Sequence, residues 1–228
     1  MAQIAERLAS LRSQLPPSVQ LIAVSKNHPA AAIREAYAAG QRHFGENRVQ
    51  EAIAKQAELT DLPDLTWHLL GKLQSNKARK AVEHFDWIHS VDSWALAERL
   101  DRIAGELGRS PKLCLQVKLL PDPNKAGWDP ADLRAELPQL SQLQQVQIRG
   151  LMVIAPLGLT AAETQALFAQ ARTFAAELQQ QAPQLRLTEL SMGMSSDWPL
   201  AVAEGATWIR VGTQLFGPRS LEHHHHHH

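Results

Sequence analysis

The sequence predicts an α/β protein with a single (β/α)8, TIM-like barrel. Eight short strand candidates alternate with helix-like segments across residues 1–220. A doubly wound sheet with about six strands uses a similar alternation, but no Gly-x-Gly-x-x-Gly motif follows the first strand candidate. We therefore expect one barrel domain at residues 1–220 and an expression tag at residues 221–228, which end in a run of His.

The strand candidates are short, and most are apolar on both faces, as is typical of strands covered by helices. Helices outside a closed ring of parallel strands would provide that cover. In chain order the candidates are residues 20–25, 42–45, 66–71, 86–91, 112–118, 147–154, 186–192 and 207–212.

Helix signals fill the intervening segments. Pro29 at a first helical position and Gly40 at an end bound the helix after the first strand candidate. Pro130 opens a later helix, and Thr160 with Glu163 forms a capping box. An amphipathic helix precedes the first strand candidate, and we expect it to fill the gap left by the short segment after the last one. Its apolar face comprises Ile4, Leu8, Leu11 and Leu15.

The composition excludes several functional classes. Hydrophobic residues make up 44% and charged residues 20% of the chain, as in a globular protein and not a disordered one. Lys and Arg total 23 and so do Asp and Glu, so nothing favours broad electrostatic binding to nucleic acid or anionic lipid. The lone Cys114 fits a reducing compartment, and no apolar run approaches the ~20 residues of a membrane span or forms a signal-peptide core. We expect a cytoplasmic protein that binds neither nucleic acid nor membrane.

Lys26 is the first candidate for chemistry, because function in a barrel gathers where the strands end. It directly follows the apolar residues 21–24. Partial desolvation would favour its neutral amine, which can form a Schiff base with an aldehyde. The alternative is a solvated loop lysine, since Lys72 and Lys118 also follow strand candidates.

Two later loops predict a phosphate site. Residues 191–199 pass from a strand through Ser and Gly to a helix start, where backbone N–H groups, hydroxyls and the helix dipole favour an anion. Gly212 and Thr213 follow the last strand candidate and add N–H donors, at the place where barrels often bind phosphate. The alternative is an ordinary capped helix and a turn glycine.

Arg210 is expected to point into the barrel. Strand alternation puts Ile209 and Val211 on one face and Trp208 with Arg210 on the other. A buried guanidinium needs a partner, so Arg210 either forms a salt bridge within the barrel or binds a ring nitrogen of a ligand beside the phosphate.

Other motifs do not indicate a site. Gly71-Lys72 lacks the remaining residues of a P-loop, and Cys114 reads as a core residue. His84 and His89 have no carboxylates at ligand spacing, so we expect no metal.

A lysine, a phosphate loop and an inward arginine together suggest pyridoxal 5′-phosphate (PLP) as the cofactor. Seven segments, in this order, resemble the signatures of the pyridoxal-phosphate homeostasis proteins. They are Ala-Val-Ser-Lys at 23–26, Phe-Gly-Glu-Asn-Arg-Val-Gln-Glu at 44–51, Trp-His at 67–68, Gly-Lys-Leu-Gln-Ser-Asn-Lys at 71–77, Arg-Gly-Leu-Met at 149–152, Leu-Ser-Met-Gly-Met-Ser-Ser-Asp at 190–197 and Arg-Val-Gly-Thr at 210–213.

The resemblance implies a barrel like the N-terminal domain of alanine racemase, the type III fold of PLP enzymes, without the C-terminal β-domain. It implies that Lys26 carries the cofactor as an internal aldimine and that Arg210 faces the pyridine nitrogen. It also implies that Asn47 and Met152 line the ring or its substituents. The phosphate would be held by Ser191, Gly193, Ser196, Gly212 and Thr213.

One segment departs from the family pattern. Val117-Lys118 and residues 121–123 stand where the family has Val-Asn and a loop containing Glu, although Lys125, Ala126 and Gly127 match. The role of this loop is therefore open.

The predicted function is PLP binding, in vitamin B6 homeostasis and in amino- and keto-acid balance, without established catalysis. An arginine stays charged and cannot protonate the ring nitrogen, so the ring is a weak electron sink. Racemisation needs acid–base groups on both faces of the substrate carbon, and the only tyrosine, Tyr37, reads as core-facing. We expect a monomer, with PLP-dependent apo-enzymes as the recipients of its PLP. The alternatives are a minimal racemase or lyase that uses Lys26 as its base, and a sugar-phosphate barrel enzyme.

Overall fold

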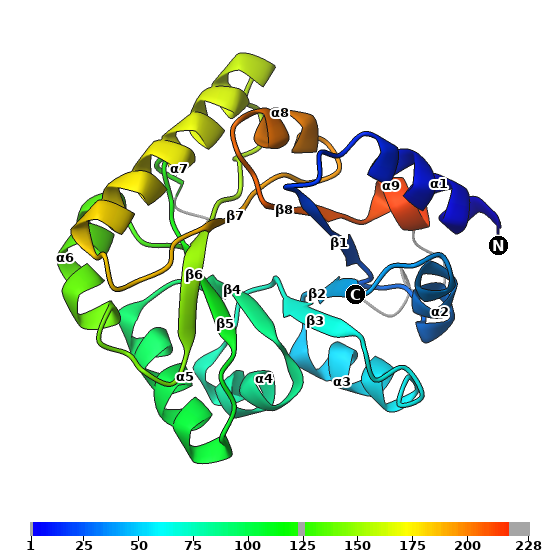
Figure 1. The fold of residues 1–228 in the computed structure, drawn as a ribbon, viewed down its shortest axis with the longest axis horizontal. Coiled ribbons are helices and arrows are strands. Elements are labelled where there is room, and N and C mark those ends of the chain that lie inside the picture. Colours follow the sequence, from blue (N-terminus) through cyan, green and yellow to red (C-terminus); the bar gives the residue numbers. More distant parts are fainter. Residues whose placement is uncertain (1, 123–125, 219–228) are drawn as a thin grey trace.

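A computed structural model describes residues 2–122 and 126–218, and it contains a closed barrel of eight parallel strands (Figure 1). Each strand pairs with the next along the chain, and the last pairs with the first. This confirms the predicted fold and all eight strands, most of them shorter than predicted. The strands are β1 (Gln20–Val24), β2 (His43–Glu46), β3 (Thr66–Leu69), β4 (Trp87–Val91), β5 (Lys112–Gln116), β6 (Gln147–Met152), β7 (Glu189–Ser191) and β8 (Trp208–Val211).

Helices surround the barrel, and local signals explain where several begin and end. The hydroxyl of Ser93 accepts a hydrogen bond from the N–H of Leu96, and Gly108 ends the same helix at a φ of 65°. The capping box of Thr160 and Glu163 is confirmed. The helices are α1 (Ala2–Ser13), α2 (Ala30–Ala38), α3 (Val49–Ala57), the short 3₁₀ helix η1 (Ser75–Lys77), α4 (Ala78–His84), α5 (Trp94–Leu107), α6 (Pro130–Leu140), α7 (Ala161–Gln181), α8 (Trp198–Ala203) and α9 (Thr213–Phe216).

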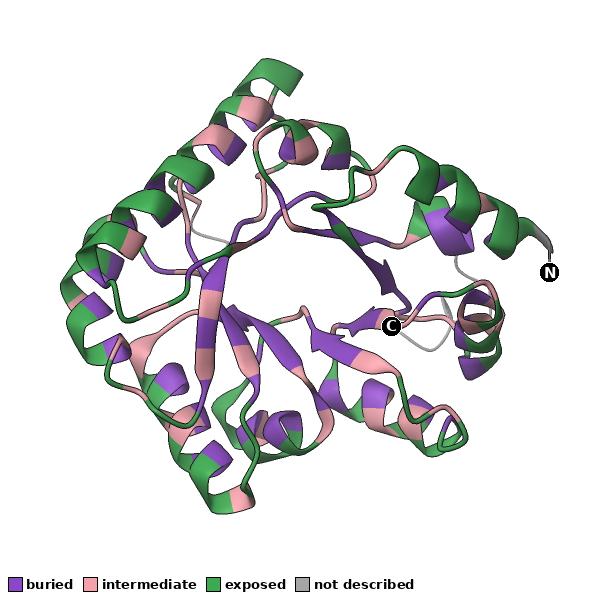
Figure 2. Ribbon diagram, in the orientation of Figure 1, coloured by how far each residue is buried: buried purple, intermediate pink, exposed green. Residues whose placement is uncertain are grey.

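Two separate groups of buried residues form the core. The larger lies between the strands and the helices and includes Ile209 and Val211. The smaller lies inside the barrel and consists of Ile22, Trp87, Cys114, Met152 and Trp208. Figure 2 shows the same division, with buried strands at the centre and helices exposed only on their outer faces. The alternation predicted for β8 is thus confirmed, and it turns Arg210 inward.

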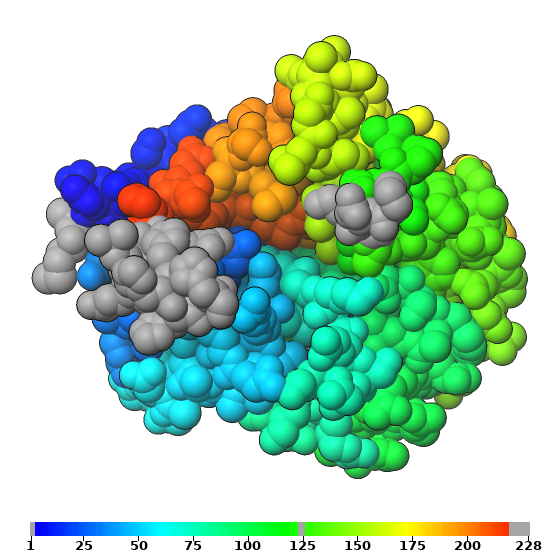
Figure 3. All heavy atoms as spheres, turned by 180° about the vertical axis from the view of Figure 1, so that it is seen from behind, coloured from blue at the N-terminus to red at the C-terminus, as the bar shows by residue number. Residues whose placement is uncertain are grey.

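The first helix closes the ring of helices. Helix α9 has only 4 residues, and α1 packs against both α9 and α2. Arg7 Nη1 donates a hydrogen bond of 3.4 Å to the backbone oxygen of Leu215 in α9. The two helices lie side by side in Figure 1 and again, in blue and red, in Figure 3. The expectation that the first helix fills the gap after the last strand is confirmed.

The position of Tyr37 differs from the prediction. Its ring is half-buried beneath the guanidinium of Arg42, and its hydroxyl donates a hydrogen bond of 2.7 Å to Asp64. Ala36, one residue earlier, occupies the core-facing position of α2. A helix turn of 3.6 residues does not allow both to face the core.

The predicted tag lies in residues 219–228, which are outside the described residues, as are Pro123, Asn124 and Lys125 of the loop that departs from the family pattern. Over the part of the chain that is described, no helix has the length and apolar character needed to span a membrane.

Candidate functional site

A cavity of about 560 Å³ opens where the strands end at their carboxyl termini. Strands β1, β6 and β8 and the loops that follow β2, β7 and β8 supply its walls. This is the end of a barrel at which the loops between strands and helices build sites. Seven of the predicted residues line the cavity together: Lys26, Asn47, Met152, Ser196, Arg210, Gly212 and Thr213.

Ser191 and Gly193 are not brought to this cavity. Ser191 ends β7, and its buried hydroxyl lies 2.8 Å from both Arg210 Nη1 and His89 Nδ1. Gly193 has a φ of +106°, and a Cβ there would lie 2.8 Å from the Cβ of Ala201 in α8. The glycine is therefore explained by close packing of the loop on a helix, and the serine by bonds inside the barrel.

Ser195, which the sequence reasoning did not single out, lines the cavity with Ser196. Its hydroxyl accepts a hydrogen bond of 3.3 Å from the backbone N–H of Gly212. This bond ties the loop after β7 to the loop after β8. The Ser/Gly segment that predicted the phosphate site includes Ser195. The sequence does not reveal where β7 stops, and therefore which serine faces the cavity.

The backbone just before Lys26 is held by charged groups of β2 and α3. The buried hydroxyl of Ser25 donates a hydrogen bond to the carboxylate of Glu46. Lys55 Nζ from α3 donates to the backbone oxygen of Ser25 at 2.7 Å and lies 3.0 Å from both carboxylate oxygens of Glu46. Burial raises the pKa of Glu46, and Lys55 opposes that shift.

A side chain of α3 also holds the backbone just after Lys26. Asn27 adopts a left-handed conformation with a φ of 64°. Its N–H donates a hydrogen bond of 2.6 Å to Glu51 Oε2, and the same oxygen lies 3.0 Å from Lys55 Nζ. Since both neighbours of Lys26 are fixed, the direction in which Lys26 leaves the backbone is fixed as well.

Arg210 reaches the cavity from inside the barrel. Its Nη1 donates to the backbone oxygen and the hydroxyl of Ser191 at 3.0 and 2.8 Å, and its Nη2 donates to the backbone oxygen of Val153 at 3.0 Å. No carboxylate of the described residues forms a salt bridge with it. Burial lowers the pKa of Arg210 to about 10, so the group remains a cation at neutral pH.

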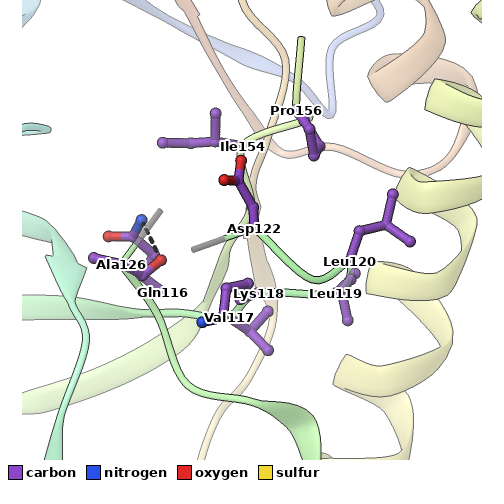
Figure 4. Close-up of a pocket in the computed structure, with 9 residues that line it drawn as sticks. All are labelled: Gln116, Val117, Lys118, Leu119, Leu120, Asp122, Ala126, Ile154 and Pro156. Atoms are coloured by element: carbon purple, nitrogen blue, oxygen red, sulfur yellow. Dashed lines mark hydrogen bonds between the residues drawn. The ribbon is translucent and has the colours of Figure 1, made fainter. Parts of the chain in front are cut away.

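A smaller hollow of about 10 Å³ lies beside the cavity, at the loop that departs from the family pattern (Figure 4). Gln116 Nε2 donates a hydrogen bond of 3.1 Å to the backbone oxygen of Ala126. Gln116, Ala126 and Ile154 border both the hollow and the cavity. In Figure 4 the carboxylate of Asp122 lies beside Ile154. Ala126 thus brings the described part of this loop to the edge of the cavity.

The donors around the cavity define what it can bind. Lys26 supplies an amine, Ser195, Ser196 and Thr213 supply hydroxyls, and Arg210 supplies a fixed guanidinium. A small molecule with an aldehyde, an anionic group and an acceptor on a ring matches this donor set. A site for a metal ion would need oxygen, nitrogen or sulfur ligands grouped at short distance, and the donor set is instead cationic or neutral.

Comparisons with known proteins agree with this assignment of the fold. A family model described as the N-terminal domain of alanine racemase matches residues 1–220. The pyridoxal phosphate homeostasis protein of Synechocystis is 54% identical over 205 residues, which cover 90% of this chain and 94% of that protein. The chain belongs to the pyridoxal phosphate homeostasis protein family. The resemblance seen in the sequence is thereby confirmed.

Two solved structures show which other proteins share this fold. A structure of PipY from Synechococcus elongatus with PLP bound has a TM-score of 0.92 and 99% identity, covering 94% of this chain and 100% of that chain. Alanine racemase of Clostridium difficile has a TM-score of 0.75 at 15% identity, and the match covers 94% of this chain and 56% of the racemase. The second likeness shows that this family and the racemase share the barrel.

Proposed function

We propose that this protein binds PLP covalently through Lys26 and acts in intracellular PLP homeostasis, and through it in amino- and keto-acid balance. The observation that carries the proposal is that Lys26, Arg210 and the loops after β7 and β8 line one cavity. Membership of the pyridoxal phosphate homeostasis family and the PLP found in PipY support it. The cofactor is PLP.

When bound, PLP supplies an aldehyde that condenses with a primary amine and a ring that can accept electrons. Lys26 Nζ is the amine in this proposal. The phosphate is held by the hydroxyls of Ser195, Ser196 and Thr213 and by the N–H groups of their loops, at the start of α8 and α9. This assignment replaces Ser191 with Ser195, because the hydroxyl of Ser191 is engaged below the cavity.

The remaining lining residues orient the ring. Arg210 offers a donor toward the ring nitrogen while Nη1 and Nη2 are engaged by protein oxygens. Asn47 and Met152 border the ring and its substituents, and Met152 is buried at the end of β6. Val24 and Leu70 keep the inner part of the cavity apolar, which limits the access of water to the bond with Lys26.

We propose a carrier and not an enzyme. Arg210 keeps its proton, so it cannot stabilise a protonated ring nitrogen, and carbanions on the cofactor gain little stabilisation. Tyr37, the only tyrosine, directs its hydroxyl to Asp64 and is not among the cavity residues. In this proposal the protein works in the cytoplasm as a monomer, limits free aldehyde and delivers PLP to PLP-dependent apo-enzymes.

The test is to trap the bond between protein and PLP. Purified protein mixed with PLP and then separated from unbound PLP should absorb in the near-visible range, and borohydride followed by peptide mapping should label Lys26. Lys26→Ala should lose both signals, while Lys118→Ala should keep both, because Lys118 also follows a strand but does not line the cavity. A label on another lysine, or none, would overturn the proposal.

A minimal racemase or lyase is the second candidate, favoured by the barrel shared with alanine racemase. Incubation of the PLP-loaded protein with a panel of amino acids separates the two. A carrier should show at most stoichiometric reaction. Steady turnover that disappears in Lys26→Ala would favour the enzyme.

A further inference from the structure

A line of polar side chains crosses the interior of the barrel and ends at Arg210. His43 Nδ1 lies 3.0 Å from His68 Nε2, and His68 Nδ1 lies 2.9 Å from His89 Nε2. His89 Nδ1 lies 2.8 Å from Ser191 Oγ, which accepts a hydrogen bond of 2.8 Å from Arg210 Nη1. We call His43, His68, His89 and Ser191 the histidine relay. It runs from the first residue of β2, at one end of the barrel, to the cavity at the other.

The surroundings of the relay are largely aromatic and apolar. The ring of Trp208 lies 4.9 Å from the rings of both His43 and His68, and the ring of Trp87 lies 5.8 Å from that of His68. His68 and His89 are fully buried. Branched apolar side chains usually fill the interior of such a barrel, and a polar chain there is costly unless every member is hydrogen-bonded. Packing alone therefore does not explain why these residues are polar.

The bonds of the relay have one direction. An arginine only donates, so Ser191 Oγ accepts from Arg210. We assign the hydrogen of the same hydroxyl to His89 Nδ1, the acceptor 2.8 Å away. His89 is then protonated on Nε2 and donates to His68 Nδ1. By the same logic His68 donates from Nε2 to His43 Nδ1. Burial lowers the pKa of His89 to about 3 and that of His68 well below 6.5, so both rings are neutral.

This direction suits a buried cation. Each hydroxyl or imidazole turns the negative end of its dipole toward Arg210, which has no carboxylate partner among the described residues. The relay is not a path for protons into the cavity, because Arg210, the group at which it ends, already holds its proton at neutral pH. It acts on the position and the charge of the guanidinium.

We propose that the histidine relay positions Arg210 against the ring nitrogen of PLP and makes that contact depend on the protonation of His43. The proposal rests on the proposed function. A protonated imidazole donates from both nitrogens, so it no longer accepts from His68 Nε2, and the first bond of the relay breaks. Reversal of the whole relay would make His89 Nδ1 a donor, so the hydroxyl hydrogen of Ser191 would lose that acceptor.

His43 is the member that can take up a proton. It is half-buried and lines a surface hollow of about 440 Å³, shared with Arg12 and Arg42, at the end of the barrel opposite the cavity. Burial lowers its pKa from 6.5, Lys112 lowers it further, and Asp86 opposes both. The loss of the relay should therefore occur below pH 6.5.

The first experiment measures the affinity for PLP and its near-visible absorbance between about pH 8 and about pH 5. The wild-type protein should lose roughly tenfold in affinity below pH 6.5, the size expected for one charge-assisted hydrogen bond. His43→Phe, which keeps a ring against Trp208, should remove this step, and His84→Gln in α4 should retain it. The same step in His43→Phe would overturn the proposal.

The second experiment does not depend on PLP. In ¹⁵N-histidine NMR spectra of the cofactor-free protein at about pH 8, His68 and His89 should be neutral tautomers protonated on Nε2. Protonation on Nδ1 of either ring would overturn the direction of the relay. If wild-type protein formed no bond with PLP, the proposed function would fail, and these spectra would still decide whether the relay exists.

Discussion

Lys55 Nζ donates a hydrogen bond of 2.7 Å to the backbone oxygen of Ser25, the residue just before Lys26. The same ammonium pairs with Glu46 and Glu51. A buried lysine from α3 thus supports the segment that carries the proposed cofactor amine.

Lys55→Met should destabilise the protein by about 3 kcal/mol, because it leaves the buried carboxylate of Glu46 without its cation. Urea unfolding measures this. The pKa of Glu46 is raised by burial, and loss of Lys55 raises it further, so the folded state binds a proton at higher pH than the unfolded state. The defect should therefore shrink as the pH falls toward that pKa. Adding Glu46→Gln should restore part of the stability at neutral pH; no recovery would contradict this account.

Stability should fall in acid because of His68 and His89. Their pKa values in the folded state are lowered by burial, to about 3 for His89, so between 6.5 and about 3 the unfolded state binds more protons. The free energy of unfolding should be level above pH 6.5 and then drop by up to about 1.4 kcal/mol per pH unit for each ring. Urea unfolding at several pH values measures the slope. His84→Gln should keep it, and a level profile in the wild-type protein would contradict the burial of these rings.

Ser191, at the end of β7, and Ser195, in the loop after it, should have different roles. Ser195→Ala should weaken PLP binding by roughly tenfold with little change in Tm, since it removes one phosphate donor at the cavity. Ser191→Ala should cost about 1–3 kcal/mol in stability even without PLP, since it leaves His89 Nδ1 and one hydrogen of Arg210 without that partner. Thermal unfolding and PLP titration of both variants test this. The reverse pattern would instead favour Ser191 as the residue that binds the phosphate.

Gly71→Ala should distort the cavity. A Cβ at this position would lie 2.3 Å from the backbone oxygen of Asn47, a residue that lines the cavity. The backbone cannot move aside as a flexible side chain can. We expect a loss of about 2 kcal/mol in stability and weaker PLP binding. Gly105→Ala in α5 is the control, because its nearest new contact, at 3.3 Å, is the flexible side chain of Gln145. Equal effects of the two substitutions would argue against the close approach at Asn47.

The alternation of strands and helices predicted the fold correctly because most strands are apolar on both faces and several helices have start or stop signals. The prediction extended several strands too far. In β3 and β6 the apolar run continues through Leu70 and Ile154, which point into the cavity beyond the last strand residue. Composition does not distinguish a paired residue from an unpaired residue that lines a site.

The site was only partly predictable. Lys26 and Arg210 stand out because a charge beside or within an apolar run needs a reason. The relay was missed because His43, His68 and His89 come from three strands, and their common line exists only once the barrel closes. The support from Lys55 was missed for the same reason, since a lysine in a helix reads as a solvated charge.

The pairing of β1 with β8 has a consequence for assembly. Lys26 leaves β1, and Gly212 follows β8, so the amine and the loop proposed to grip the phosphate are separated by almost the whole chain. Loop closure over such a distance is slow compared with local helix formation. During synthesis, the lysine is made long before its partners. Under the proposed binding mode, a half-made chain therefore lacks the loops that would hold the phosphate.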